Sequence, residues 1–216
     1  VEDIEACRKM TFDAGEEPIG GTSWWLDPIC LGRYPDTTGY SYGAYIPDTT
    51  AEDMKIISQP IDFIGMNVYQ TYRGKAGENG TCITIPNDPG YARTNAEWSV
   101  TPEALYWGPK FYEERYHKKL YITENGLSNQ DWIFLDGQVH DLQRIDFLHR
   151  YLYQLKRAVE EGISVEGYFH WTLTDNFEWT SGYNNRFGLV YTDFKNQNRI
   201  IKDSGKWYRQ VIETNG

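Results

Sequence analysis

A carboxylate at the end of a predicted strand is the first group in this sequence that could do chemistry. Residues 119–123 alternate bulky and β-branched side chains, which is typical of a short buried strand, and Glu124 follows. Asn125-Gly126 is a strong turn signal, so we expect the strand to stop at the carboxylate. Catalytic groups of β/α proteins lie at strand ends, where a carboxylate can act as nucleophile or general base. On these residues alone, a turn-capping surface glutamate is the more economical interpretation.

Two further segments are predicted to be strands, and each also ends in polar or aromatic groups. The near-continuous apolar run of 60–69, with Pro60 at its entrance, predicts a strand that is buried on both faces. It ends at Asn67 and Tyr69. Residues 164–171 form the third predicted strand, and it ends at Trp171. Candidate functional groups therefore gather at the carboxyl ends of all three strands.

Helices are predicted between these strands, and they decide how the strands can pair. Helical spacing or capping signals predict helices over 1–14, 51–58, 101–117, 141–161 and 203–213. Segment 16–50 is predicted to be a long ordered loop, and loops are also predicted for 70–100, for 128–140 and for the segment that follows the third strand as far as Asp193. Alternating α and β elements favour parallel strands with right-handed crossovers, as in a (β/α) barrel. Three parallel strands alone would leave their edges exposed.

Composition narrows the classes of partner. The chain has 216 residues and is predicted to form a single domain over 1–216. Its net charge of −10 argues against binding to nucleic acid or to anionic membranes. Its apolar runs are too short to span a bilayer. Aromatic residues make up 16% of the chain, including 17 Tyr and 8 Trp, whose flat faces with polar edges suit sugar rings as well as protein cores.

The cysteines indicate neither a metal site nor a disulfide framework. Cys7, Cys30 and Cys82 are widely spaced in sequence, odd in number and match no zinc pattern, so we expect reduced thiols, a cytoplasmic protein and no metal or cofactor. The sequence begins with Val1, not Met, so we expect a processed piece or a fragment of a longer protein. The absence of a signal peptide then says little about the parent.

Five motifs, in order along nearly the whole chain, carry a family resemblance. They are Trp25-Leu26-Asp27-Pro28, residues 62–69, residues 98–103, Thr123-Glu124-Asn125-Gly126, and Gly167 through Glu178-Trp179 to Arg186-Phe187-Gly188. With them the chain resembles the C-terminal half of a glycoside hydrolase of family 1, the β-glucosidase family. The resemblance implies an α/β fold that supplies the last three β/α units of a (β/α)8 TIM barrel.

The resemblance also implies a role for each matching residue. Glu124 corresponds to the nucleophile, Tyr69 to the tyrosine that orients it, and Asn67 to its neighbour in the sugar site. The remaining matches would bind substrate: Glu178 grips sugar hydroxyls, Trp171 and Trp179 hold the ring, Phe187 lines the pocket, and Trp98 is the aglycone platform. Without the motifs, the aromatic residues would be interpreted as packing residues and Glu178 as a solvated charge. His170 precedes Trp171 by one position and is expected to face away from the pocket as a structural residue.

Two departures from the family pattern shape the functional expectation. Glu178, Trp179, Asn185 and Phe187 stand where phospho-sugar members carry other residues, so a neutral β-glucoside or related β-glycoside is expected. The family's acid/base glutamate lies in an Asn-Glu-Pro motif, and this chain contains no such motif. A retaining glycosidase needs that second carboxyl about 5–5.5 Å from the nucleophile. The chain alone is therefore expected to be inactive or nearly so.

Two hypotheses follow. In the first, the chain is part of a retaining β-glycosidase that acts with a complementary N-terminal barrel half. In the second, it is a non-catalytic sugar-binding or structural half-barrel. Either way, uncovered strand edges predict pairing with that half or self-association.

Overall fold

The computed structural model describes residues 1–13, 21–36 and 48–215, and the chain divides into two compact units. Unit 1 comprises Val1–Asp62 and Tyr72–Asp88, and unit 2 comprises Phe63–Thr71 and Pro89–Gly216. The three predicted strands lie in unit 2, except for residues 60–62 at the start of the first. The single domain expected over 1–216 stays a prediction, because two compact units can fold either together or separately.

Unit 1 is built from helices and one hairpin. Its elements are α1 (Glu2–Asp13), α2 (Thr22–Leu31), α3 (Ala51–Ile57), β2 (Arg73–Ala76), the short η3 (Glu78–Gly80) and β3 (Cys82–Ile85). Strands β2 and β3 pair antiparallel, and α1 packs against this hairpin. The main-chain N–H of Ala76 donates to Asp3 Oδ1 at 2.7 Å, which fixes α1 to β2.

Two loop predictions in unit 1 are wrong. Residues 22–31 form α2 although they contain Pro28; the helix ends at Gly32, whose φ of 69° is in the left-handed region. Within 70–100, residues 73–85 form the hairpin, whose short strands lack a strong alternating pattern. The rest of the predicted 16–50 loop lies partly outside the described residues. The predicted helix at 51–58 is confirmed as α3, with a capping box between Thr50 and Asp53.

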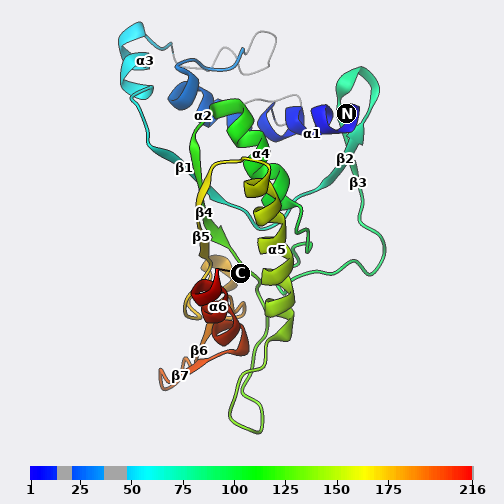
Figure 1. Ribbon diagram of the computed structural model, residues 1–216, viewed down its shortest axis with the longest axis vertical. Coiled ribbons are helices and arrows are strands. Elements are labelled where there is room, and N and C mark those ends of the chain that lie inside the picture. Colours follow the sequence, from blue (N-terminus) through cyan, green and yellow to red (C-terminus); the bar gives the residue numbers. More distant parts are fainter. Residues whose placement is uncertain (14–20, 37–47, 216) are drawn as a thin grey trace. The chain divides into compact units, whose positions relative to one another are not determined.

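Unit 2 contains a parallel sheet that holds the candidate catalytic strand at its centre. The strands are β1 (Phe63–Asn67), β4 (Lys119–Asn125) and β5 (Val165–His170), in the order β1-β4-β5 (Figure 1). Helices α4 (Ala104–Tyr116) and α5 (Leu142–Glu160) connect them. The predicted parallel β/α arrangement is confirmed, and the carboxyl ends of the three strands lie at the same edge of the sheet.

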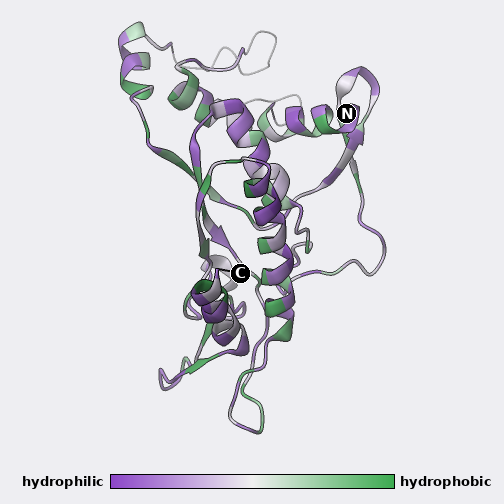
Figure 2. Cartoon of the chain, viewed as in Figure 1, coloured by the Kyte–Doolittle hydropathy of each residue, from purple (hydrophilic) through white to green (hydrophobic). Residues whose placement is uncertain are grey.

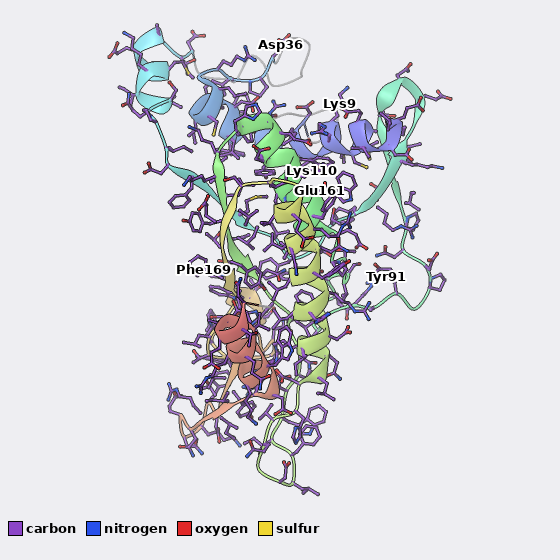
Figure 3. All side chains as sticks on the ribbon, viewed as in Figure 1. Lys9, Asp36, Tyr91, Lys110, Glu161 and Phe169 are labelled. Atoms are coloured by element: carbon purple, nitrogen blue, oxygen red, sulfur yellow. The ribbon has the colours of Figure 1, made fainter. Side chains whose placement is uncertain are left out.

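One face of this sheet is covered and the other is open. Ile64 and Met66 on β1, with Leu120 and Ile122 on β4, are at most 7% exposed. Phe63 is 50% exposed and Phe169, labelled on β5 in Figure 3, is 57% exposed. The prediction that β1 is buried on both faces is therefore wrong for this chain. Side chains alternate along a strand, and the described residues leave one of the two faces uncovered.

The covering helices pack on each other through polar and aromatic contacts. Hydrophobic and hydrophilic residues are interspersed along α5 (Figure 2), as expected for the amphipathic helix that the sequence predicts. Beyond the end of α5, Glu161 accepts a hydrogen bond from Tyr106 at 2.6 Å and pairs with Lys110 at 3.0 Å (Figure 3). The predicted start of α4 at Thr101 is early, since the helix begins at Ala104.

A second short hairpin follows β5. The chain continues through η4 (Trp179–Ser181), β6 (Val190–Thr192) and β7 (Arg199–Ile201) to the last helix, α6 (Asp203–Thr214). Strands β6 and β7 pair antiparallel. This hairpin was not predicted: β6 lies within the loop predicted as far as Asp193, and β7 lies beyond it. Among the described residues, no helix combines the length and apolar character needed to cross a membrane.

Candidate active site

The site is centred on Glu124, at the carboxyl end of β4. Tyr69, just beyond the end of β1, donates a hydrogen bond from its hydroxyl to Glu124 Oε2 at 2.7 Å. The parallel pairing of β1 with β4 makes this contact possible, because Asn67 is the register partner of Glu124 and Val68 N–H donates to Glu124 O at 2.9 Å. Burial, this hydrogen bond, and the negative charges of Glu124 and Glu178 raise the pKa of Tyr69 far above its ordinary value. Tyr69 therefore remains a hydrogen-bond donor.

A second carboxylate, Glu178, lies in the same neighbourhood. Trp171 follows β5 and donates its indole N–H to Glu178 Oε1 at 3.1 Å. Burial raises the pKa of Glu178, and the negative charges of Glu124 and Asp175 add to this, while the Trp171 hydrogen bond opposes it. The two glutamates thus interact electrostatically across the ends of β4 and β5.

Three aromatic rings from separate segments gather beside Glu124. The centroids of Tyr69 and Trp98 are 5.0 Å apart, those of Trp98 and Phe187 6.0 Å, and those of Tyr69 and Phe187 6.2 Å. Phe187 is only 3% exposed, whereas Trp98 is half-buried. The cluster forms an apolar wall next to the carboxylate, with Phe187 behind the more accessible rings.

The remaining two predicted residues lie at the margins of this group. Asn67 is exposed, and its Oδ1 accepts a hydrogen bond from the Thr123 hydroxyl at 2.8 Å on the open face of the sheet. Trp179 is 82% exposed at the start of η4, with a positive φ of 45°. The structure therefore brings together Tyr69, Trp98, Glu124, Trp171, Glu178 and Phe187, keeps Asn67 next to Glu124 by register, and leaves Trp179 in solvent.

The turn predicted at Asn125-Gly126 is wrong. Asn125 is the last residue of β4 and is fully buried; its Nδ2 donates to Val68 O and its Oδ1 accepts from the Tyr168 hydroxyl, both at 2.8 Å. A Cβ at position 126 would lie 1.9 Å from Trp171 O, so only glycine allows this close approach. Asn125 and Gly126 thus connect the ends of β1, β4 and β5 directly beside Glu124.

Tyr151 is a supporting residue that the sequence pattern does not reveal. It lies on α5, is fully buried, and donates its hydroxyl to the main-chain O of Tyr69 at 2.9 Å. The same hydroxyl accepts from Thr101 N–H at 2.8 Å. In sequence it is one more residue on the buried side of a helix, and nothing in its spacing distinguishes it from a packing residue.

A network of buried charges supports the segments around Phe187 and Glu178. Lys202 Nζ donates to Asp131 Oδ2 at 2.6 Å and to Asp175 Oδ1 at 2.8 Å. Arg144 pairs with Asp131 and Asp141 and also donates to Arg186 O at 2.9 Å. These side chains have no exposed surface. This network is not predictable from the sequence, because its members come from distant segments.

Asp175 and His170 connect that network to Phe187. Asp175 Oδ1 accepts from Gly188 N–H at 2.9 Å, and His170 Nε2 lies 3.2 Å from Phe187 O, as a donor in that tautomer. Burial lowers the pKa of His170 to about 3, so its ring is neutral. His170 also packs on Tyr208 of α6, with ring centroids 6.2 Å apart, in agreement with the structural role expected for it.

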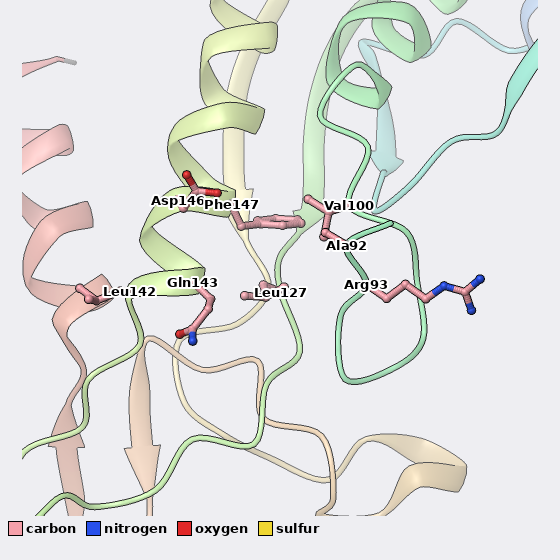
Figure 4. A pocket seen from close by; sticks show the side chains of 8 residues that line it. All are labelled: Ala92, Arg93, Val100, Leu127, Leu142, Gln143, Asp146 and Phe147. Atoms are coloured by element: carbon pink, nitrogen blue, oxygen red, sulfur yellow. The ribbon is translucent and has the colours of Figure 1, made fainter. Parts of the chain in front are cut away.

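An open apolar hollow of about 450 Å³ lies elsewhere in unit 2, between α5 and the 92–100 loop (Figure 4). None of the predicted site residues lines it. Its walls are formed by Ala92, Arg93, Val100, Leu127, Leu142, Gln143, Asp146 and Phe147. Across the ranges that the structure describes, no group of three or more His, Cys, Asp or Glu is placed to hold a metal ion.

The fold and the site together define a class. Parallel β/α units that gather a carboxylate and aromatic rings at the carboxyl ends of their strands are typical of an enzyme of the β/α-barrel class. The family model of glycosyl hydrolase family 1 matches residues 12–216, and the chain belongs to this family.

Individual relatives agree with this assignment. The chain is 41% identical over its whole length to 1,4-beta-D-glucan glucohydrolase of Thermotoga neapolitana and 39% identical to beta-glucosidase A of Thermotoga maritima. It covers 47% of each, so it spans about half the length of these relatives. The solved structure of the Thermotoga maritima beta-glucosidase in complex with castanospermine superposes with a TM-score of 0.82 at 37% identity, covering 98% of this chain and 46% of that one. The structure is thus a partial TIM barrel that contains three parallel strands of the family fold.

Proposed function

We propose that this chain is the nucleophile-bearing part of a retaining β-glycosidase. The observation that carries the proposal is the 2.7 Å hydrogen bond from Tyr69 to Glu124, at the point where two parallel strands end. A covalent glycosyl-enzyme mechanism needs a carboxylate that is ionised and held in one orientation. Tyr69 supplies that orientation, because it stays protonated and donates to one carboxylate oxygen only.

The surrounding residues would bind a neutral sugar. Glu178, held by the Trp171 indole, can accept hydrogen bonds from two adjacent hydroxyls of the ring. Its carboxylate would repel a phosphorylated sugar, which favours a β-glucoside or related neutral β-glycoside. Trp171 and Trp179 would hold the ring, with Asn67 beside the nucleophile. Trp98 would meet the aglycone, and Phe187 supports its ring from behind.

The proton donor would come from a complementary N-terminal barrel half. The sequence holds no Asn-Glu-Pro motif, so no residue matches the family's acid/base glutamate. Loss of a general acid slows a reaction by about 10²–10⁴-fold, and a half-formed pocket slows it further. We therefore expect very slow turnover of ordinary β-glucosides by this chain alone, and faster turnover when the complementary half is present.

Covalent labelling separates a competent nucleophile from an unassembled site. The probe is a 2-deoxy-2-fluoro β-glucoside with a dinitrophenolate leaving group, which departs without protonation. The intact mass should rise by one fluoroglucosyl group, and the labelled peptide should contain Glu124. Glu124→Gln should abolish the adduct, while Glu97→Gln, a matched change at an exposed glutamate, should leave it. A wild-type chain that never labels contradicts the proposal for the isolated chain.

Complementation tests whether the chain acts as half of an enzyme. The chain would be co-expressed with the N-terminal half of beta-glucosidase A of Thermotoga maritima, and hydrolysis of an aryl β-glucoside followed. Activity that requires both halves and is lost with Glu124→Gln supports the proposal. If the two halves co-purify without hydrolysing the substrate, the catalytic part of the proposal fails.

The second candidate is a sugar-binding half-barrel without catalysis. The Trp171–Glu178 pair favours it, because this pair is assembled within the chain and needs no proton donor. Binding of a β-glucoside that is weakened by Glu178→Ala but unaffected by Glu124→Gln, together with no covalent label, would favour this alternative.

A further inference from the structure

Two of the three cysteines, far apart in sequence, lie side by side in unit 1. Cys7 is on α1 and Cys82 is the first residue of β3, 75 positions later. Their sulfur atoms are 3.7 Å apart, both residues are half-buried, and neither forms a disulfide. Wide spacing in the sequence therefore does not keep these two thiols apart in the fold.

The backbone around the pair is shaped to hold two sulfur atoms. Gly74 on β2 faces them, and a Cβ at this position would lie 2.6 Å from each sulfur. Ala76 is the register partner of Cys82, and its N–H donates to Asp3 on α1, one helical turn before Cys7. The hydrogen bond fixes α1 to the hairpin, and the glycine leaves space for both thiols.

We propose that Cys7 and Cys82 form a dithiol site that reacts with a two-electron thiol oxidant, a peroxide or a small-molecule disulfide, and closes a disulfide between α1 and β3. With hydrogen peroxide, one thiolate attacks the O–O bond and becomes a sulfenic acid while the first water leaves. The second thiolate attacks that sulfur and displaces the second water, so that two thiols and one peroxide give one disulfide and two waters.

The electrostatics indicate the order of the two steps. Burial raises the pKa of Cys7 to about 11, and the hydrogen bond to Cys82 and negative charge on that sulfur contribute further. Cys7 is therefore the less acidic sulfur, and in the proposed order Cys82 attacks the oxidant first, after which Cys7 loses its proton as it attacks the sulfenic acid and closes the disulfide. The closed bond would restrict the unfolded chain over a long loop, so the oxidised form should unfold at a higher temperature.

Peptide mapping of the full chain tests this site directly. The reduced protein is treated with hydrogen peroxide or oxidised glutathione, alkylated and digested with trypsin. We expect a linked pair of peptides, Val1–Arg8 with Ala76–Arg93, while Cys30 is recovered alkylated on its own peptide. A reductant should restore both thiols. Recovery of Cys7 and Cys82 as separate alkylated or over-oxidised thiols, with no linked peptide, overturns the proposal.

Variants confirm which cysteines respond. Cys7→Ser and Cys82→Ser should each abolish the linked peptide and the rise in unfolding temperature on oxidation, while Cys30→Ser should keep both. A temperature rise that survives in Cys7→Ser, or that disappears in Cys30→Ser, assigns the effect to another pair and contradicts the proposal. Neither measurement depends on glycosidase activity.

Discussion

Tyr69 and Glu124 are 55 positions apart in sequence and meet only because β1 and β4 are parallel neighbours. Tyr69→Phe keeps the ring, its contact with Trp98 and the packing, and removes only the donated hydrogen bond. Hydrogen bonds to charged groups contribute about 1.5–3 kcal/mol, so labelling by the fluoroglucoside should slow by about 10–100-fold. Tyr153→Phe, at an exposed tyrosine of α5, is the matched control and should label at the wild-type rate. Equal rates for the two variants would remove Tyr69 from the mechanism.

Glu178 should make stability depend on pH in a direction that its environment fixes. Burial and the charge of Glu124 raise its pKa in the folded chain above the ordinary value of 4.5. The ionised form is therefore unfavourable in the fold, and stability decreases as pH rises from 4.5 through the raised pKa. Glu178→Gln removes that charge and keeps an oxygen for the Trp171 indole. We expect a higher unfolding temperature than wild type at neutral pH and no difference in acid.

The control for this experiment is Glu97→Gln, which removes an exposed charge of the same kind. It should shift the unfolding temperature little at any pH. Glu178→Gln should also weaken binding of a β-glucoside, because the amide accepts fewer hydrogen bonds than the carboxylate. A variant that is less stable than wild type at neutral pH would show that Glu178 is stabilised, not strained, by its surroundings.

At the residue scale, the sequence identifies groups that react and misses groups that support them. Glu124 and Glu178 stand in distinctive motifs, and the structure brings their neighbourhoods together. Tyr151 and Arg144 hold the main chain of Tyr69 and Arg186. Neither belongs to the apolar period that predicts this helix, so only the three-dimensional contacts reveal that they are buried and which partners they have.

At the element scale, the strength of the local pattern decides which predictions succeed. The long amphipathic helix α5 is predictable because its apolar residues repeat one period over many positions, and β1 because its apolar run is nearly continuous. Helix α2 was missed because residues 16–50 are rich in Gly, Pro, Asp and Tyr, and Pro28 lies inside the helix. The hairpins β2–β3 and β6–β7 have strands of only three or four residues, which are too short for a pattern and depend on tertiary packing.

The buried charge network is the element-scale feature most sensitive to mutation. Arg144→Met leaves Asp141 without its cation, and burial already raises the pKa of that carboxyl despite the arginine. Removing one partner of a buried pair costs about 3–5 kcal/mol, which urea unfolding should detect. Arg150→Met on the same helix breaks an exposed pair with Asp146, which water already screens, and should change the urea midpoint little. Similar losses for the two variants would mean that the network contributes little.

At the scale of the whole molecule, the open face of the sheet and the chain's half-length match to its relatives both indicate a partial barrel. The chain covers 47% of the Thermotoga relatives, and the described residues provide three parallel strands with β1 and β5 at the sheet edges. Strand edges and apolar faces of this kind attract other chains. We predict that the purified chain associates with itself in a concentration-dependent way unless a complementary half is bound.

Phe169 tests that prediction, since it is a large exposed apolar side chain on edge strand β5. Phe169→Lys places a charge on the open face, and burying that charge against a second chain would be unfavourable, so sedimentation velocity should show a shift towards monomer. Leu135→Lys, at a fully exposed loop residue outside the sheet, removes as much apolar surface and should leave association unchanged. If wild type stays monomeric at high concentration, or if both variants dissociate equally, the sheet face is not the surface that pairs.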